Sequence, residues 1–189
     1  MQLDTITRSK YYIAFKDVGL FIIITLAFHF LFRAFAVKIY GLEISKQLSL
    51  FLQSLLFDNS TWIIRHILRI DFVTDGFKMT FLANNGYVAV NESCSGLKIF
   101  LQFTVLMILF PGPWKHKLWY IPAGLVLLHI TNIFRIVGLA QVTISLPQYW
   151  NFSHDYFFRP LFYVVIFTLW VIWVEYFYTK KEPKIVIKK

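Results

Sequence analysis

The sequence predicts an all-α integral membrane protein with about four transmembrane helices, amphipathic helices on the outer face of the membrane and a small β-hairpin. The composition carries this prediction. Hydrophobic residues make up 58% of the 189 residues and charged residues only 15%, whereas soluble domains have roughly 45–50% apolar and about 25% charged residues. Several apolar runs also approach about 20 residues, the length at which a helix crosses a bilayer.

The distribution of basic residues predicts the orientation of these helices. The formal net charge is +9, but the lysines stand beside apolar runs, so we interpret the charge as membrane orientation. We expect membrane lipids and not nucleic acid as partners. The short basic segments are the N-terminus, residues 115–117 and the C-terminal tail. The positive-inside rule places all three in the cytoplasm, which gives four spans with both termini inside.

We therefore treat the chain as a single membrane domain with alternating spans and connections. The first apolar run has no small-residue cleavage site after it, which favours a retained helix over a signal peptide. The predicted segments are a cytoplasmic N-terminus at 1–16, a first span at 17–40, an outer segment at 41–93, a second span at 94–110, a cytoplasmic loop at 111–117, a third span at 118–136, an outer loop at 137–158, a fourth span at 159–178 and a cytoplasmic tail at 179–189.

Prolines mark the boundaries of the later spans. Pro111 and Pro113 flank a glycine and end the second span, because proline cannot continue a helix. Pro160 suits the first turn of the last span, where its missing N–H costs nothing.

The outer segment begins with residues 41–70, which are amphipathic. Leucines and Phe51 recur at helical spacing over 48–56, and a second piece at 62–70 has Arg65 and Arg69 beside apolar residues. The first run is too short to span a bilayer, so we predict two helices along the membrane surface. A broken fifth membrane segment is the alternative interpretation.

The rest of the outer segment is typical of a β-hairpin. Residues 77–81 alternate between apolar and polar, and residues 87–90 have high β propensity, so we expect residues 77–82 to pair with 87–90. Asn85-Gly86 lies between them, and this dipeptide best tolerates the positive φ angles of a type I′ turn. We expect the two stretches to pair and to deliver the chain to the second span.

Cys94, the only cysteine, stands at the predicted start of the second span. A single cysteine excludes a disulfide within the chain. Ser93 or Ser95 can cap the following helix, and the positive end of the helix macrodipole favours a thiolate. Lys98 follows by four residues, so a helix beginning at Cys94 would place both on one face.

Polar residues of the later spans fall at the same predicted depth. His129, Asn132 and Arg135 are three residues apart in the third span, and Arg135 is at its outer end. His154 precedes the fourth span on the outer side. Intramembrane polar residues usually face a bundle interior or a water-filled site. An arginine that snorkels to the headgroups and a solvated histidine are the alternatives.

A cysteine, an arginine and a histidine at one depth suit acyl transfer or peptide cleavage. A thiolate is the nucleophile, a histidine carries the proton, and a guanidinium stabilises an oxyanion. We predict Cys94, Arg135 and His154 in these roles, and no metal or cofactor. The residues expected around them are Glu92, Ser95, Lys98, Asn132 and Asp155. We expect Asp155 to pair with Arg159 at the surface, four residues on, instead of orienting the histidine.

Three elements resemble the exosortase/archaeosortase family: residues 93–97 (Ser-Cys-Ser-Gly-Leu), residues 132–136 (Asn-Ile-Phe-Arg-Ile), and His154 before the last span. The resemblance covers roughly residues 90–178. It implies a multi-span protein that processes exported proteins with a C-terminal sorting signal, made of a short motif, an apolar helix and a basic cluster. It also implies a Cys94–Arg135–His154 triad, here on the outer, periplasmic face of the bacterial inner membrane. Lys98 stands where longer members commonly have arginine.

The chain is short for that family, which leaves the substrate class open and allows a membrane-protein partner or a second copy of the chain to complete the site. Two other functions stay open. One is a scaffold or assembly factor with the fold but without activity. The other is a small transporter whose polar stripes line a path, and a transporter should tolerate Cys94→Ser.

Overall fold

The computed structural model describes residues 2–178 and contains four helical segments long and apolar enough to cross a membrane. These candidate spans are Phe15–Ala36, Glu92–Leu109, Trp114–Ser145 and Pro147–Tyr178. Large apolar side chains point outward from them: Phe30 is 66% exposed, Val126 60% and Val164 58%. Such surfaces are unfavourable in water and suited to lipid. The chain is therefore a multi-pass membrane protein, and the predicted fold class is confirmed.

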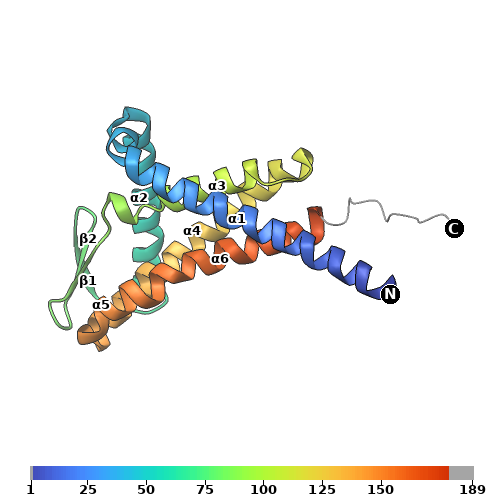
Figure 1. The fold of residues 1–189 in the computed structure, drawn as a ribbon. Helices are drawn as coiled ribbons and strands as arrows, with labels where there is room; N and C mark the ends of the chain where they lie inside the picture. Colours follow the sequence, from blue (N-terminus) through green and yellow to red (C-terminus); the bar gives the residue numbers. More distant parts are fainter. Residues whose placement is uncertain (1, 179–189) are drawn as a thin grey trace.

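The spans are arranged so that their ends gather at two ends of the bundle. Figure 1 shows the start of α1, the turn between α3 and α4 and the end of α6 at one end, with the β-sheet and α5 at the other. The principal helices are α1 (Gln2–Gly41), α2 (Glu43–His66), α3 (Leu97–Leu109), α4 (Trp114–Ser145) and α6 (Arg159–Trp173). Pro111 follows the end of α3, and Pro160 lies in the first turn of α6, as the sequence predicts.

The fourth span is continuous, although its helical geometry changes along its length. A 3-10 turn η2 (Pro147–Tyr149) leads into α5 (Trp150–Phe152) and a π-helical stretch η3 (Ser153–Phe158), and α6 is followed by a second π-helical stretch η4 (Val174–Tyr178). π-Helical turns are rare and often occur at functional sites. Here η3 carries His154.

Two hydrophobic clusters hold the helices together. One, between α3, α4 and α6, is rich in aromatic residues; Phe103, Phe110 and Trp173 are fully buried in it. Its buried Tyr120 donates its hydroxyl to the carbonyl of Leu169 at 2.7 Å, which satisfies the one polar atom of the ring. The other cluster packs the β-sheet against α2 and α4 through residues such as Met79. The second cluster fixes the sheet next to the segment that carries Cys94.

Helix α2 is one continuous helix, so the prediction of two separate amphipathic pieces is wrong. The polar stretch at residues 58–61, which suggested an interruption, remains helical. Ser60 is buried, and the Thr61 hydroxyl bonds back to the carbonyl of Phe57 at 2.9 Å. Buried Gln53 donates to the carbonyl of Val90 and ties α2 to the end of the sheet. The polar residues of α2 are thus partly internal.

The predicted hairpin is present, and a third strand extends it. Strand β2 (Lys78–Phe81) pairs antiparallel with β3 (Tyr87–Ala89), with Met79 opposite Val88. The additional strand β1 (Phe72–Asp75) pairs with the other edge of β2. The sequence did not predict β1. Of its four side chains only that of Phe72 is buried, so the strand has no alternation of apolar and polar residues that would identify it.

The turn of the hairpin differs from the predicted type I′ turn. Asn85 has a positive φ of 55°, but Gly86 is not among the residues with positive φ. The main chain of Phe81 instead accepts from Asn85 and donates to Gly86, so four residues lie between the paired positions. Asn84 also donates to the carbonyl of Thr143 at 2.7 Å and anchors this loop to α4. The tertiary contact explains the longer turn.

Helix α4 extends beyond the predicted third span at both ends. Residues 114–117, predicted as part of a cytoplasmic loop, form its first turn. Lys117 is buried, and its ammonium donates to the carbonyls of Ile108 and Phe110 at 3.0 and 2.7 Å. These carbonyls are at the C-terminal end of α3, where helical partners are missing. Lys117 is therefore a cap for the neighbouring helix, not a loop charge.

At its other end α4 continues from Arg135 to Ser145, so Arg135 does not end the helix. Residues 137–145, predicted as outer loop, are helical, and residues 147–158 form η2, α5 and η3. The sequence suggested a loop because polar residues become frequent after 140. In the structure Thr143 satisfies its hydroxyl by bonding back to the carbonyl of Leu139 at 2.8 Å. Local hydrogen bonding lets a helix carry these residues.

Candidate active site

Cys94 lies in a tight turn between β3 and α3. It is the last residue of a short 3-10 helix, η1 (Glu92–Cys94), and α3 begins only at Leu97. The side chain of Asn91 accepts from the Cys94 N–H at 3.1 Å and from the Ser93 hydroxyl at 2.6 Å. Cys94 therefore lies near the start of the candidate span Glu92–Leu109, but it precedes α3 and is not in the first turn of that helix. The asparagine cap, not the α3 macrodipole, fixes the local conformation of the cysteine.

The turn is held against α4 by Asn132, which was predicted as a residue around the site. Its side-chain amide donates to the carbonyl of Cys94 at 2.9 Å. Gly96 has a φ of 88°, and a Cβ atom there would lie 3.0 Å from the same amide nitrogen. Glycine is favoured at this position for both reasons. The main chain of the cysteine is thus placed by a buried asparagine on a neighbouring helix.

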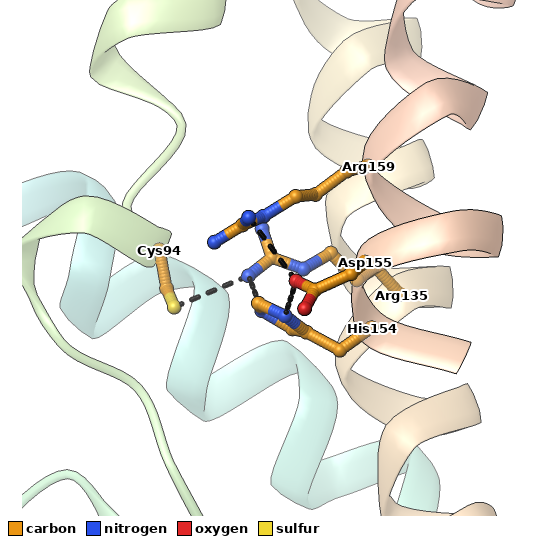
Figure 2. Close-up of polar contacts among 5 residues, drawn as sticks. All are labelled: Cys94, Arg135, His154, Asp155 and Arg159. Carbon is orange, nitrogen blue, oxygen red and sulfur yellow. Dashed lines mark hydrogen bonds and ion pairs between the residues drawn. The ribbon is translucent and has the colours of Figure 1, made fainter. Parts of the chain in front are cut away.

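The side chains of Cys94, Arg135 and His154 meet in one place (Figure 2). The Arg135 Nη2 atom lies 3.3 Å from the Cys94 Sγ atom and 3.4 Å from the His154 Nε2 atom. One guanidinium nitrogen thus bridges the sulfur and the imidazole. Because a guanidinium only donates, both the sulfur and Nε2 act as acceptors in this arrangement. A positive group beside the sulfur stabilises negative charge on it.

His154 is oriented from its other side by Asp155. Its Nδ1 atom lies 2.8 Å from the Asp155 Oδ1 atom, and the same oxygen lies 3.1 Å from the Arg159 Nη1 atom (Figure 2). A carboxylate accepts, so Nδ1 carries the hydrogen and Nε2 presents its lone pair. The expected pair of Asp155 with Arg159 is present, but Asp155 also contacts the histidine, so only the expectation that it would not orient His154 is wrong. The indole of Trp150 stacks on the imidazole with centroids 4.9 Å apart.

These residues line a pocket of about 580 Å³, within the usual range for ligand sites. Part of the lining comes from residues between Val88 and Ile99, including Cys94, and the rest comes from residues of α4, α5, η3 and α6. Lys98, Arg135 and Arg159 give the lining a positive character. The Lys98 ammonium lies 5.5 Å from the ring centroid of Phe32 on α1. The pocket therefore combines a thiol, an imidazole and several cations.

The other residues predicted around the site divide into two groups. Asn132 and Asp155 bond to the main chain or side chains of the three central residues, and Lys98 lines the pocket. Glu92 is exposed and does not line the pocket, and Ser95 is fully buried with its hydroxyl 3.2 Å from that of Ser49. Lys98 was expected near Cys94 because residues four apart share a face of a helix. The two residues do line one pocket, but Cys94 precedes α3, so the helical spacing is not the reason.

The predicted polar stripe on α4 also divides. Asn132 and Arg135 reach the Cys94 segment, whereas the Nε2 atom of His129 lies 3.4 Å from the Asn59 amide on α2. His129 lines a separate apolar groove between α2, α3 and α4. A spacing of three residues drifts around a helix with 3.6 residues per turn, so the first member faces a different neighbour.

Two residues of the site were not predicted from the sequence. Trp150 precedes His154 by four residues, which is one helical turn and would place the two rings together. Asn91 precedes Cys94 by three, the spacing of a side-chain cap. Both spacings can be read from the sequence, but they indicate these contacts only if the two segments are known to be helical. Within the described residues, no three His, Cys, Asp or Glu side chains form a group that could hold a metal ion.

The fold and the site define a class of protein: a multi-pass helical membrane protein whose single thiol shares a pocket with an arginine and a histidine. The comparison with protein families agrees with this class and identifies one family within it. A family model described as transmembrane exosortase matches residues 18–171, and the chain belongs to this family. Searches of curated proteins and of solved structures found no match.

Proposed function

We propose that this protein is a cysteine peptidase or transpeptidase that processes the C-terminal sorting signals of exported proteins. The observation that carries the proposal is the single Arg135 nitrogen within 3.4 Å of both the Cys94 sulfur and the His154 imidazole. Membership of the exosortase family supports it. An inactive scaffold or a transporter would need no such arrangement of a nucleophile, a proton carrier and an oxyanion donor.

The reaction begins at the sulfur. As the Cys94 sulfur attacks the carbonyl carbon of the scissile peptide bond, the Nε2 lone pair of His154 takes the thiol proton, and the electron pair of the carbonyl moves to oxygen. Arg135 has five N–H donors and uses one nitrogen for the sulfur and the imidazole, so other donors can bind the oxyanion. His154 then protonates the leaving amine, and a thioester remains on Cys94.

The second half of the reaction releases the product. Water or an amine attacks the thioester carbonyl, and the Nε2 atom of His154 takes the proton of the incoming nucleophile. The thiolate leaves and takes that proton from His154, so the site returns to its first state. Asp155 acts as a positioning residue, because its carboxylate keeps the Nδ1–H tautomer and leaves Nε2 free for these transfers.

The position of the pocket supports a membrane-anchored substrate. The pocket lies at the sheet end of the bundle, and the apolar spans extend away from it (Figure 1). A substrate whose apolar helix lies in the bilayer beside these spans would present the motif before that helix at the same depth. With the N-terminus in the cytoplasm by the positive-inside rule, the site faces the outer, periplasmic side of the bacterial inner membrane. A membrane-protein partner or a second copy of this chain can complete the site.

The direct test is to look for a covalent intermediate at Cys94. The full chain is co-expressed with an exported protein of the same organism that ends in a short motif, an apolar helix and a basic cluster. Intact-mass analysis should show the chain carrying the processed reporter, in a bond released by hydroxylamine at neutral pH, as expected for a thioester. Processing that continues unchanged with Cys94→Ala would contradict the proposal.

The orientation gives a separate prediction. Trp114 begins α4 and Tyr149 follows its end, so the two positions flank one span. Reporter fusions after Trp114 and after Tyr149 should report the cytoplasm and the outer side, respectively. The same side for both would exclude the four-span topology, and a reversed result would place the pocket in the cytoplasm.

A further inference from the structure

Strand β3 forms a free edge of the sheet, and its register determines which main-chain groups are unpaired. The sheet order is β1-β2-β3, so β3 has a neighbour on one side only. Val90 donates to Phe77 and Phe81 donates to Gly86, which makes 77–90 and 81–86 hydrogen-bonded pairs. Because such pairs alternate, Met79–Val88 is also bonded, whereas Lys78–Ala89 is not. The N–H and C=O of Ala89 therefore point away from β2.

This unpaired edge forms part of the pocket that contains Cys94. Val88 and Ala89 line the pocket together with Cys94, Trp150 and His154. Ala89 itself is exposed, and among the described residues none forms a hydrogen bond with its N–H or C=O. The pocket therefore includes a free donor and a free acceptor of the main chain, five residues before Cys94 in the sequence.

The edge is rigid because its alternate side chains are anchored. Val88 and Val90 are buried at 3% and 2% exposure in the cluster formed with α2 and α4. Gln53 on α2 holds the carbonyl of Val90, and Asn84 fixes the loop before β3 to α4. A strand fixed in this way is already in the conformation needed to pair with another strand, which lowers the entropic cost of binding.

We propose that the substrate binds as an extended peptide that adds a strand to β3, with its main chain paired to the N–H and C=O of Ala89. This inference rests on the proposed function, because the substrate of that function is the peptide that Cys94 attacks. An extended peptide is the ligand that presents a matching donor and acceptor at strand spacing. Strand addition also recognises the main chain irrespective of side chains. Specificity would then come from the side chains of Lys98, Arg135 and Arg159, which line the same pocket.

The test uses two alkylating probes with the same reactive group, Ala-Ala-Ala chloromethyl ketone and chloroacetone. Each forms a sulfur–carbon bond with the Cys94 thiolate as chloride leaves, and intact-mass analysis follows the reaction because the chain has one cysteine. The measured quantity is the ratio of the two alkylation rate constants on the purified full chain. We expect the peptide probe to react faster, because only it can pair with the strand edge.

Ala89→Pro removes the N–H that faces the pocket without removing a bond to β2, and proline is tolerated at such edge positions. It should lower the rate ratio by up to about tenfold, the effect of losing one hydrogen bond. Tyr87→Pro is the matched control, since Tyr87 is also unpaired toward β2 but does not line the pocket. The control should keep the ratio of the native chain.

The outcomes separate this inference from the proposed function. A ratio that falls in Ala89→Pro alone, with the chloroacetone rate unchanged, supports strand addition even when no sorting signal is processed. A ratio that is unchanged in Ala89→Pro, or that falls equally in Tyr87→Pro, overturns it. An N-methyl group on the peptide probe's amides removes the donor to the Ala89 carbonyl, which proline keeps, so it should reduce the ratio in the native chain and reduce it further in Ala89→Pro.

Discussion

Cys94→Ser should lower the rate of signal processing by about four orders of magnitude or more, the usual cost of removing the nucleophile from a group that acts as a unit. Serine keeps the size of the side chain but is a far weaker nucleophile without a strong base. In this site the group beside the sulfur is the Arg135 guanidinium, which stabilises a thiolate but takes no proton from a hydroxyl. Processing of the co-expressed reporter, followed by its change in mass, measures the effect.

The same variant should remain folded. Cys94 is half-buried, and its carbonyl and N–H, which bond to Asn132 and Asn91, belong to the main chain. We expect a change in unfolding free energy of about 1 kcal/mol or less. Ser54→Ala, at a hydroxyl of α2 that bonds only to Asp58, is the control and should process normally. Substantial processing by Cys94→Ser would instead favour the scaffold or the transporter.

Arg135→Lys should reduce kcat by about 10²–10³-fold, the effect of losing an oxyanion donor. The native guanidinium contacts the sulfur and the imidazole through one nitrogen and keeps further donors for the substrate. An ammonium is a compact point charge at the end of a flexible stem and lacks this fork. The charge of the pocket is unchanged, so KM should change less than kcat.

The control for this substitution is Arg33→Lys, because Arg33 is exposed on α1 and does not line the pocket. It should leave processing unchanged. Purified variants are compared by the rate of reporter cleavage and by the rate of Cys94 alkylation with iodoacetamide. If Arg135→Lys retains processing within tenfold of the native rate, the arginine is a structural or headgroup-binding residue, and the proposed oxyanion role is incorrect.

Most of the fold follows from one-dimensional patterns. A run of about 20 apolar residues that crosses a bilayer forms a helix, because a helix satisfies the main-chain hydrogen bonds within one segment and needs no water. Alternation around Asn85-Gly86 predicted the β2–β3 pairing for a similar local reason. The limits of helices were less predictable. Lys117 and Thr143 suggested loops, but each finds hydrogen-bond partners, in another helix or in its own, that allow the helix to continue.

For the site, the sequence determined which residue types fall at one membrane depth. The order of the spans and the positive-inside rule brought Cys94, Arg135 and His154 to the same end of the bundle, and the motifs pointed to the same residues. The sequence did not determine how they are connected. Asp155 was assigned to Arg159 alone because i, i+4 pairs are visible in a sequence, whereas the direction of a neighbouring imidazole is not.

The tertiary structure decided that Arg135 lies between the sulfur and the histidine, that Asn132 holds the Cys94 carbonyl, and that the β3 edge forms a wall of the same pocket. Each of these depends on the packing of α4 against the sheet and the Cys94 turn. Spacing along the chain determines depth in the membrane and the face of a helix. Distances between elements depend on how closely their buried side chains pack, which only the folded structure specifies.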